Sequence, residues 1–473
     1  MMHVMGRRSI GVLLAILAVG LFASGCDWSQ FGFDAAHTGD NAYDTTVTPS
    51  NVSTLSLKFT DSFSRGVESQ PAIVNGVMYV VSNSGYLDAY SANGTTDCSG
   101  TPSTCTPLWS AQVATPGASD PQTPAVVDGN VYVLSDSSEQ VEGFDASGKT
   151  NCSGTPTVCT PVWHATVING LGQSLAASNG LLYVTSIVQG GGSSKGDVLE
   201  AFDASGKTNC SGTPTVCTPV WSSTAFGAEY FLQDFSVSVA NGIAYAIAGN
   251  AIYAFDANGA TDCTGSPKVC SPMWEYTGLT TGASEYAVIS GSTLFVDTFQ
   301  ITGVSPDLSY IGALDAFDAN GATDCSGTPK VCTPLWQSSG NQFASQAAPT
   351  VANGLVFVPT EAGDIAAFDA NGSTNCTGAP KACAPVWTTS VSGGQPVVGG
   401  NVLYATSGNN VEAFDTSGSA GCVSSVCSPL WSSSTPNTPS GELTIANGVL
   451  YISGSVPAGI QNGGVVEAYA LPS

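Results

Sequence analysis

A cysteine pair followed by a tryptophan recurs along the chain and constrains its fold more than any other feature. In the stretch DANGATDCTGSPKVCSPMW, Cys263 and Cys270 stand seven positions apart, and Trp274 follows. Six further copies bring fourteen of the fifteen cysteines and seven of the eight tryptophans into one pattern. Successive tryptophans lie 44 to 62 residues apart, a period typical of propeller blades and other arrays. We therefore predict one repeat architecture instead of several ordinary domains.

Each unit has the pattern of a four-stranded antiparallel meander. In the sixth unit, four short apolar runs between residues 349 and 390 are separated by turn sequences. Asn353-Gly354 is a strong hairpin signal, because both positions tolerate positive φ. Eight such units occur, and the last lacks a fourth strand, which we expect residues 55–60 to supply. The ring then has no open sheet edge, so the predicted fold is an all-β, eight-bladed propeller closed by an amino-terminal strand.

The repeated phrase resembles the blade of pyrroloquinoline-quinone-type propellers. It reads turn, Tyr-Val, Ala-Phe-Asp-Ala-x-Gly and Trp, and the opening WSQFGFDAAHTGDN is similar to the start of such proteins. In that family the alanine, aspartate, glycine and tryptophan lock neighbouring blades together. The resemblance implies this role for the matching residues of the third and fifth units, which are Ala201, Asp203, Gly206, Trp221, Ala316, Asp318, Gly321 and Trp336. It implies nothing about activity.

The amino-terminal residues have the pattern of an export signal. Arg7 and Arg8 precede an uncharged apolar run at residues 10–22, too short to span a bilayer. Small residues then lead to Cys26, the one cysteine outside the seven pairs. The segment resembles a bacterial lipoprotein signal, in which this cysteine becomes the lipid-bearing first residue, with a plain secretory signal as the alternative. The expected divisions are a signal peptide at 1–25, an opening segment at 26–54 and the propeller at 55–473.

Locally paired cysteines in an exported chain are expected to form disulfides. Gly-Thr-Pro between the two cysteines supplies a turn that lets their Cα atoms approach within disulfide range. The seven predicted bonds are Cys98–Cys105, Cys152–Cys159, Cys210–Cys217, Cys263–Cys270, Cys325–Cys332, Cys376–Cys383 and Cys422–Cys427.

Charge and motif content argue against several partners and cofactors. Without Arg7 and Arg8 the chain carries eight Lys+Arg against 35 Asp+Glu, a formal charge of 8 − 35 = −27, so nucleic acid is not expected as a partner. No C-x-x-C or C-x-x-C-H motif supports a zinc or haem site. Adjacent cysteines are absent, and only Trp28 stands outside the blade-locking positions, so no quinone cofactor is expected. Calcium at turns such as residues 256–259 is the lesser alternative to structural turns.

Functional residues are expected on one face of the ring. The cysteine loops join third and fourth strands and share one face, whereas irregular insertions at residues 186–197, 297–312 and 453–464 lie on the other. Long variable loops often bind partners. Polar candidates at the channel mouth on that face are Arg65, Glu68, Gln70, Gln122, Asp234, Glu285, Tyr286 and Gln346. A solvated rim without a ligand is the alternative.

These features predict a non-catalytic, lipid-anchored, extracytoplasmic propeller of the bacterial cell envelope, periplasmic or on the cell surface. It is expected to act as a monomeric binding or assembly scaffold for a protein or carbohydrate, with membrane contact through the lipid. A carbohydrate- or polymer-binding surface protein and a quinone-dependent dehydrogenase stay open as alternatives. Arg65 is the only arginine beyond Arg8, and its planar fork suits an anionic group.

Overall fold

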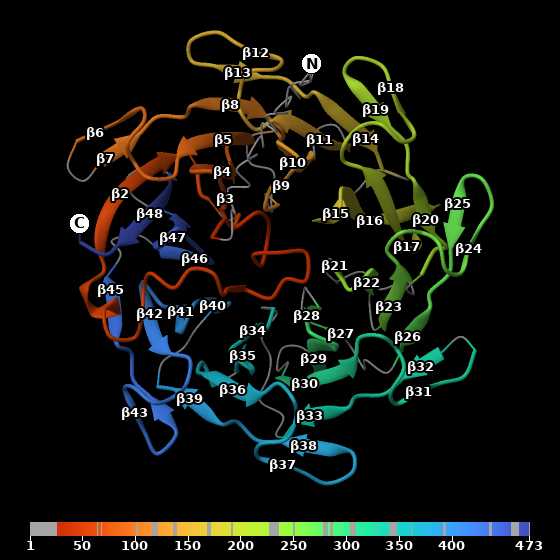
Figure 1. The fold of residues 1–473 in the computed structure, drawn as a ribbon, viewed down its shortest axis with the longest axis vertical. Helices are drawn as coiled ribbons and strands as arrows, with labels where there is room; N and C mark the ends of the chain where they lie inside the picture. Colours follow the sequence, from red (N-terminus) through yellow and green to blue (C-terminus); the bar gives the residue numbers. More distant parts are fainter. Residues whose placement is uncertain are drawn as a thin grey trace, which may run out of the picture.

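Eight sheets stand around a central axis and form a closed ring (Figure 1). The predicted all-β, eight-bladed propeller is therefore confirmed. A computed structural model describes residues 26–472 apart from 64, 68, 101–102, 116–121, 136–139, 168–171, 191–192, 227–235, 249–250, 278–281, 284–286, 303–308, 329, 340–347, 361, 391–393, 435–437 and 456–462.

Each blade is a meander of four strands, which follow one another from the channel outward. Blades 1 to 4 comprise β3 Ala72–Val74, β4 Val77–Ser82, β5 Tyr86–Ser91 and β8 Trp109–Gln112; β9 Ala125–Val127, β10 Asn130–Ser135, β11 Gln140–Asp145 and β14 Trp163–Thr166; β15 Gly172–Ser178, β16 Leu181–Gly190, β17 Ser193–Asp203 and β20 Trp221–Ser223; β21 Ser236–Ala240, β22 Ile243–Ala248, β23 Ala251–Asp256 and β26 Trp274–Tyr276. Blades 5 to 8 comprise β28 Val288–Ser290, β29 Thr293–Thr302, β30 Ser309–Asp318 and β33 Trp336–Ser338, with β27 Gly282–Ala283 beside β29; β34 Thr350–Ala352, β35 Leu355–Pro359, β36 Ile365–Asp369 and β39 Trp387–Thr389; β40 Val397–Gly399, β41 Val402–Ser407, β42 Asn410–Asp415 and β45 Trp431–Ser434; β46 Thr438–Ala446, β47 Val449–Ser455, β48 Gly464–Ala470 and β2 Ser56–Phe63.

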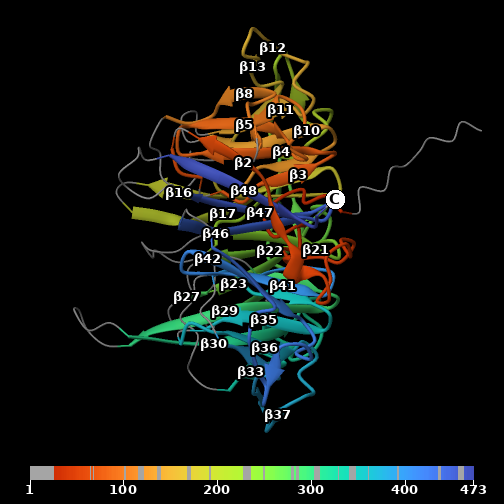
Figure 2. The same cartoon turned by 90° about the vertical axis from the view of Figure 1, so that its left-hand side faces the viewer.

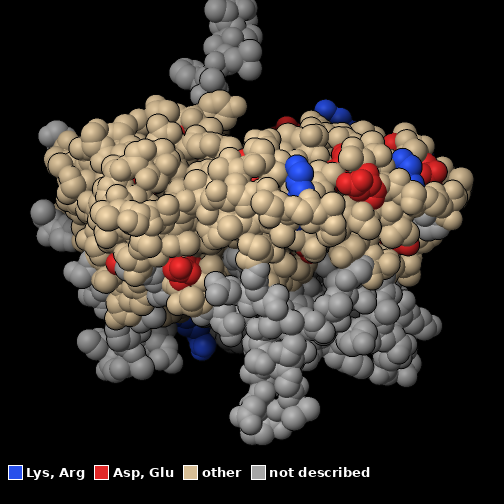
Figure 3. All heavy atoms as spheres, turned by 90° about the horizontal axis from the view of Figure 1, so that it is seen from below, with Lys and Arg blue, Asp and Glu red and all other residues tan. Residues whose placement is uncertain are grey.

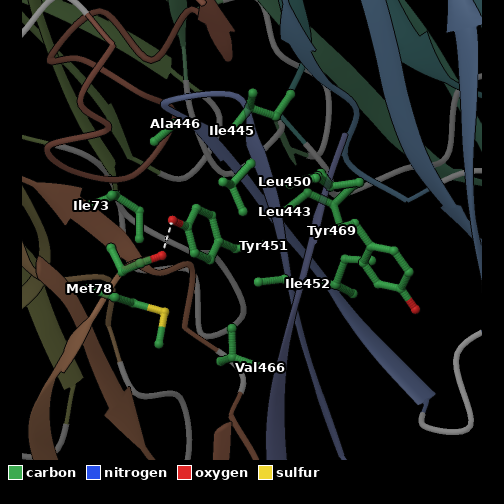
Figure 4. Packing of buried hydrophobic residues seen from close by; sticks show 14 of the residues in the cluster. Ile73, Met78, Leu443, Ile445, Ala446, Leu450, Tyr451, Ile452, Val466 and Tyr469 are labelled. Atoms are coloured by element: carbon green, nitrogen blue, oxygen red, sulfur yellow. Dashed lines mark hydrogen bonds between the residues drawn. The ribbon is translucent and has the colours of Figure 1, made fainter. Parts of the chain in front are cut away.

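The two ends of the propeller meet in blade 8. Strand β2 pairs antiparallel with β48 and supplies the missing fourth strand, as predicted, although it is longer than residues 55–60. Buried side chains from both ends pack in one cluster, in which Ile73 and Met78 of blade 1 lie near Tyr451 of blade 8 (Figure 4). The Tyr451 hydroxyl donates a hydrogen bond of 2.7 Å to the Ala92 carbonyl. Closure thus joins the chain ends by a sheet ladder and by a shared core.

Most sheets have six strands instead of the four predicted, because each cysteine loop is a small hairpin. The hairpins are β6 Cys98–Gly100 with β7 Ser103–Cys105, β12 Cys152–Ser153 with β13 Val158–Cys159, β18 Cys210–Ser211 with β19 Thr215–Cys217, β24 Cys263–Thr264 with β25 Lys268–Cys270, β31 Cys325–Ser326 with β32 Lys330–Cys332, β37 Cys376–Thr377 with β38 Lys381–Cys383, and β43 Cys422–Val423 with β44 Val426–Cys427. Each pairs in parallel with the fourth strand of the preceding blade and covers its outer edge, which would otherwise offer unpaired N–H and C=O groups.

The seven predicted disulfides are present. In each hairpin the two cysteines lie directly opposite one another, as Cys210 and Cys217 do in β18 and β19, and their Cα atoms are 3.9 to 4.1 Å apart. Cys26 is the free cysteine of the described chain. The hairpins project from the perimeter (Figure 1), so each disulfide stabilises an outer element and none crosses the channel.

A repeated lock joins neighbouring blades, as the family resemblance implies. Trp274 Nε1 and the Tyr245 hydroxyl both donate to the Ala319 carbonyl of the next blade at 3.1 Å. Gly321 lies against the same indole at φ +61°, and a Cβ there would come within 2.4 Å of Trp274 Cδ1. Close contact and backbone conformation therefore both require glycine.

The aspartate of the repeated phrase holds the turn that follows it. Asp318 accepts hydrogen bonds from the backbone N–H groups of Asn320 and Thr323 at 2.9 and 2.7 Å. Burial opposes ionisation of Asp318, but these hydrogen bonds outweigh it and lower its pKa. The carboxylate is thus used by its own loop, which agrees with the interpretation as a structural turn.

Candidate functional site

The opening segment lies at the centre of the ring, on the side of β3 and β21 (Figure 1 and Figure 2, red). It includes β1 Asp40–Asn41 and the short helix η1 Val52–Thr54. Strand β1 pairs in parallel with β40, the innermost strand of blade 7. We call residues 27–44 the central segment.

The central segment bonds to the innermost strand of every blade at the same height. Each blade contributes the residue two positions before its first hairpin turn. The contacts are Ile73 with Trp28 in both directions (2.7 and 2.8 Å), Val126 N–H to Ser29 O (2.8 Å), Ala177 N–H to Gln30 Oε1 (2.8 Å), Val239 N–H to Ala35 O (2.6 Å), Ile289 N–H to Ala36 O (3.0 Å), Val351 N–H to Thr38 O (2.8 Å), Val398 N–H to Gly39 O (2.8 Å) and Asn41 Nδ2 to Ile445 O (2.8 Å). The segment therefore satisfies inner sheet edges that would otherwise face the channel.

Gln70, predicted at the channel mouth, is instead buried beneath the central segment. Its Oε1 accepts hydrogen bonds from Trp28 Nε1 at 3.0 Å and from the Gly32 N–H at 2.8 Å. Its Nε2 donates to the Leu443 carbonyl at 2.7 Å. The side-chain amide therefore ties the segment to blades 1 and 8.

His37 is buried within the segment. Its ring packs edge-on against Phe31 at a centroid distance of 5.5 Å, and Nδ1 lies 3.4 Å from the Ser238 hydroxyl of blade 4. Burial lowers the pKa of His37 to about 3, so the imidazole is neutral at pH 7. This placement agrees with its interpretation as a packed polar residue.

Cys26 lies on the face formed by the first hairpin turns. Its carbonyl accepts a hydrogen bond from Asn41 Nδ2 at 3.0 Å, and its Sγ lies 3.4 Å from the Tyr43 carbonyl. Asp27 accepts from the N–H of Asn75, which begins the first turn of blade 1, at 3.1 Å. We call this face, which carries the turns between first and second strands, the turn face.

The insertions lie on the opposite face, which we call the insertion face. Strands β16, β17, β29 and β30 extend beyond the ring on one side, whereas β3 and β21 lie toward the other (Figure 2). Arg65 is exposed on the insertion face, and its carbonyl lies beside Gly464, where β48 begins after the third insertion. Within the described chain, no hydrogen bond or ion pair joins its guanidinium group.

The other candidates at the channel mouth are only partly described. Gln122 is half-buried just before β9. The candidates outside the described residues are Glu68, Asp234, Glu285, Tyr286 and Gln346. The described residues therefore remove Gln70 from the mouth and place Arg65 beside the start of β48, the third strand of blade 8.

A set of acidic residues within the ring wall was not anticipated from the sequence. In six blades the residue before the alanine or glycine of the third strand is acidic: Asp88, Glu142, Glu200, Asp315, Glu412 and Glu467. Five are buried and Glu142 is half-buried. Burial raises the pKa of Asp315 to about 6, although Gln337 and Thr298 donate hydrogen bonds to it. An acidic residue recurs six times at one position of the repeat, and this recurrence could have predicted the set from the sequence.

A metal ion or a stacked quinone would need particular groups among the described residues. Among them no group of three or more His, Cys, Asp or Glu side chains could hold a metal ion. Trp28 is fully buried and its Nε1 is bonded to Gln70, so its ring offers no open face for stacking. The part of the chain that the structure describes also contains no helix long and apolar enough to cross a membrane.

Comparisons with known proteins agree with the fold. The family model of the outer membrane protein assembly factor BamB matches residues 155–467. The quinohemoprotein alcohol dehydrogenase of Comamonas testosteroni is similar over 95% of this chain and 81% of its own, with 14% identity and a TM-score of 0.56. A europium-containing methanol dehydrogenase is similar over 95% of this chain and 99% of its own, with 12% identity and a TM-score of 0.55. At these identities the two structures show the fold alone.

A short sequence match is also to an alcohol dehydrogenase. The 1-butanol dehydrogenase (cytochrome c) of Thauera butanivorans is 37% identical over 76 residues, which are 16% of this chain and 11% of that protein. The expectation of a chain without a cofactor, and with quinone disfavoured, is contradicted by these dehydrogenase relatives. It rested on two local absences, adjacent cysteines and a stacking tryptophan, whereas the similarity extends along the whole ring.

Proposed function

Because this chain belongs to the family of the outer membrane protein assembly factor BamB, we propose that it is a non-catalytic, lipid-anchored scaffold of the cell envelope. In this proposal it binds a protein partner through its insertion face. The BamB match, residues 155–467, covers the blades that carry all three insertions. The family takes its name from assembly at an outer membrane, which fits a scaffold better than it fits catalysis.

The observation that carries the proposal is the opposite placement of Cys26 and the insertions. Cys26 lies on the turn face beside Asn41 and Tyr43. The elongated strands β16, β17, β29 and β30 extend from the other face (Figure 2). A lipid on Cys26 would therefore hold one face at the membrane and leave the insertion face open to a partner.

We expect Cys26→Ser to release the protein from membranes. A serine side chain cannot form the thioether through which lipid is attached. Stable anchoring needs about two acyl chains, so a variant without lipid should fractionate as a free protein. The measurement is membrane fractionation with intact-mass analysis of the full-length chain made in a bacterium. Unchanged membrane retention by the serine variant would refute the anchor.

We expect Arg65→Ala to reduce capture of the native partner severalfold without lowering the melting temperature. The exposed guanidinium has no partner in the described chain, so its loss should leave stability within about 0.5 kcal/mol. Arg65→Lys tests whether a planar fork is needed. The measurement is photo-crosslinking from the insertion face in cells, followed by mass spectrometry. Lys149→Ala, in a turn on the other face, is the matched control; full capture by Arg65→Ala would remove this residue from the binding surface.

Oxidation of alcohols would contradict the non-catalytic part of the proposal. The similarity to alcohol dehydrogenases makes this outcome worth testing directly. The purified protein is incubated with pyrroloquinoline quinone, Ca²⁺, an alcohol and an artificial electron acceptor. Turnover that depends on the quinone would replace the scaffold by an enzyme, whereas partner capture without turnover would support the scaffold.

A further inference from the structure

The link between Cys26 and the ring is short and is held by hydrogen bonds. Trp28 already pairs with Ile73 through both backbone groups, Asp27 accepts a hydrogen bond from Asn75, and the Cys26 carbonyl accepts one from Asn41. An extended chain spans at most about 3.6 Å per residue, so two residues separate Cys26 from the blade by about 7 Å or less. A flexible tether would instead allow the ring to turn freely, since its reach grows by roughly 5–6 Å × √n.

An exposed aromatic side chain lies beside Cys26. The Tyr43 carbonyl is 3.4 Å from Cys26 Sγ, and the Tyr43 side chain is 68% exposed, the most exposed large aromatic of the described residues. Tyrosine is enriched at membrane interfaces, because its ring is apolar and its hydroxyl remains hydrated. At the edge of a lipid anchor this side chain would reach the headgroup layer.

The turns that surround Cys26 are almost uncharged. The central residues of the eight first-hairpin turns are Asn75-Gly76, Asp128-Gly129, Asn179-Gly180, Asn241-Gly242, Gly291-Ser292, Asn353-Gly354, Gly400-Asn401 and Asn447-Gly448. Only Asp128 among them is charged, in a chain of formal charge −25 overall. Seen edge-on, the wall of the ring carries scattered charged residues on a largely uncharged surface (Figure 3). The central segment adds four aspartates to this side of the ring, the buried Asp44 and the half-buried Asp27, Asp34 and Asp40. Burial raises the pKa of Asp34 and Asp40, so Asp27 and Asp128 are the carboxylates that anionic lipid would meet first.

We propose that the turn face lies directly on the lipid bilayer, so that the ring is parallel to the membrane and the insertion face is directed away from it. This inference rests on the lipid anchor of the proposed function and deepens it. The headgroup layer is about 5–8 Å thick on each side of the hydrocarbon core, comparable to the reach from Cys26 to the blade. Lipid chains hold the protein, and the short link sets its orientation.

Two exposed tyrosines on opposite faces allow a matched test. Tyr43 lies on the turn face, and Tyr86, which is 37% exposed, begins the third strand of blade 1 on the insertion face. Each is replaced in turn by p-acetylphenylalanine, which is close in size and accepts a spin label without disturbing the disulfides. The full-length lipidated protein is reconstituted into vesicles of phosphatidylethanolamine and phosphatidylglycerol. Collision rates with oxygen and with a water-soluble nickel complex then report depth.

We expect the label at Tyr43 to collide severalfold less with the nickel complex on vesicles than in the soluble Cys26→Ser protein. The label at Tyr86 should be unchanged. Equal values at both sites on bound protein would overturn the orientation alone. Failure of the lipidated preparation to bind vesicles would overturn the anchor and, with it, the orientation.

An added linker separates orientation from attachment. Twelve Gly and Ser residues inserted between Cys26 and Asp27 give a reach of about 17–21 Å, so the lipid remains while the turn face is released. We expect membrane retention to persist and nickel collisions at Tyr43 to rise toward the soluble value. Persistent shielding of Tyr43 would show that the short link does not set the orientation.

Discussion

Trp28→Ala should lower the free energy of unfolding by about 3–5 kcal/mol, the largest loss expected from a single substitution in the central segment. Trp28 is fully buried, packs edge-on against Phe33 at 5.4 Å, and donates to Gln70. The truncation creates a cavity and leaves the Gln70 oxygen with one donor fewer. Chemical denaturation of the mature chain gives the change directly.

The control for this prediction is Tyr43→Ala, in the same segment but 68% exposed. It should change stability by no more than about 0.5 kcal/mol. A loss below about 1 kcal/mol for Trp28→Ala would mean that the central segment contributes little to the ring. Trp28→Phe, which keeps most of the apolar volume, should lie between the two.

Acidification from pH 7.5 to pH 5 should raise the melting temperature. Burial raises the pKa of Asp40 and Asp197 to about 7 and that of Asp61, Asp88 and Asp315 to about 6. The folded chain therefore holds protons that the unfolded chain, with carboxyl pKa values near 3.9, has released. The stability from each group is complete below about pH 4 and is lost as the pH rises through 6 to 7.

His37 and the turn aspartates limit the rise in melting temperature on acidification. The lowered pKa of His37, about 3, contributes stability above about pH 6.5 that is lost as the pH falls. One imidazole opposes five carboxyls, and each extra proton on the folded state is worth about 1.4 kcal/mol per pH unit. Hydrogen bonds lower the pKa of turn aspartates such as Asp145, to about 2, despite partial burial, so stability should fall again below about pH 4.

Asp61→Asn isolates one member of the set. Asp61 is fully buried, Oδ1 accepts the Cys105 N–H at 3.0 Å, and Oδ2 has no hydrogen-bond partner within the described chain. The neutral amide should raise the melting temperature at pH 7.5 and change it little at pH 5. Asp324→Asn, in an exposed turn, is the control. A melting temperature that falls steadily from pH 7.5 to 5 would contradict the assignment.

The blades could be predicted because their signals are local. Asn-Gly turns, the Ala-Phe-Asp phrase and the cysteine spacing each act within a few residues, so the meander, the disulfides and the closing strand β2 followed from the sequence. The sequence did not predict that a hairpin such as β18–β19 pairs with β14 of the preceding blade. This pairing depends on an outer edge some fifty residues away, and no short pattern encodes it.

The centre of the ring was harder to predict for the same reason. Gln30 and Gln70 look like ordinary polar residues, yet one bonds to Ala177 and the other to Leu443. Their roles depend on a segment without regular periodicity that crosses all eight blades. Arg65 lies on the insertion face, and its role in binding a ligand stays a prediction.

The offset between hairpin and blade has a consequence for how such a ring can grow. The cysteine hairpin of each repeat unit pairs with the fourth strand of the preceding blade, so each unit contributes to two sheets. A tandem gene duplication would therefore insert a blade together with the hairpin that covers the preceding blade, whereas the innermost strand of the new blade would still need a partner in the central segment. Only the eighth unit lacks a hairpin; there η1 lies against β45 and Trp431 donates to the Leu55 carbonyl at 3.2 Å. Within the described chain, the outer edge of blade 7 is thus the one that no cysteine hairpin covers.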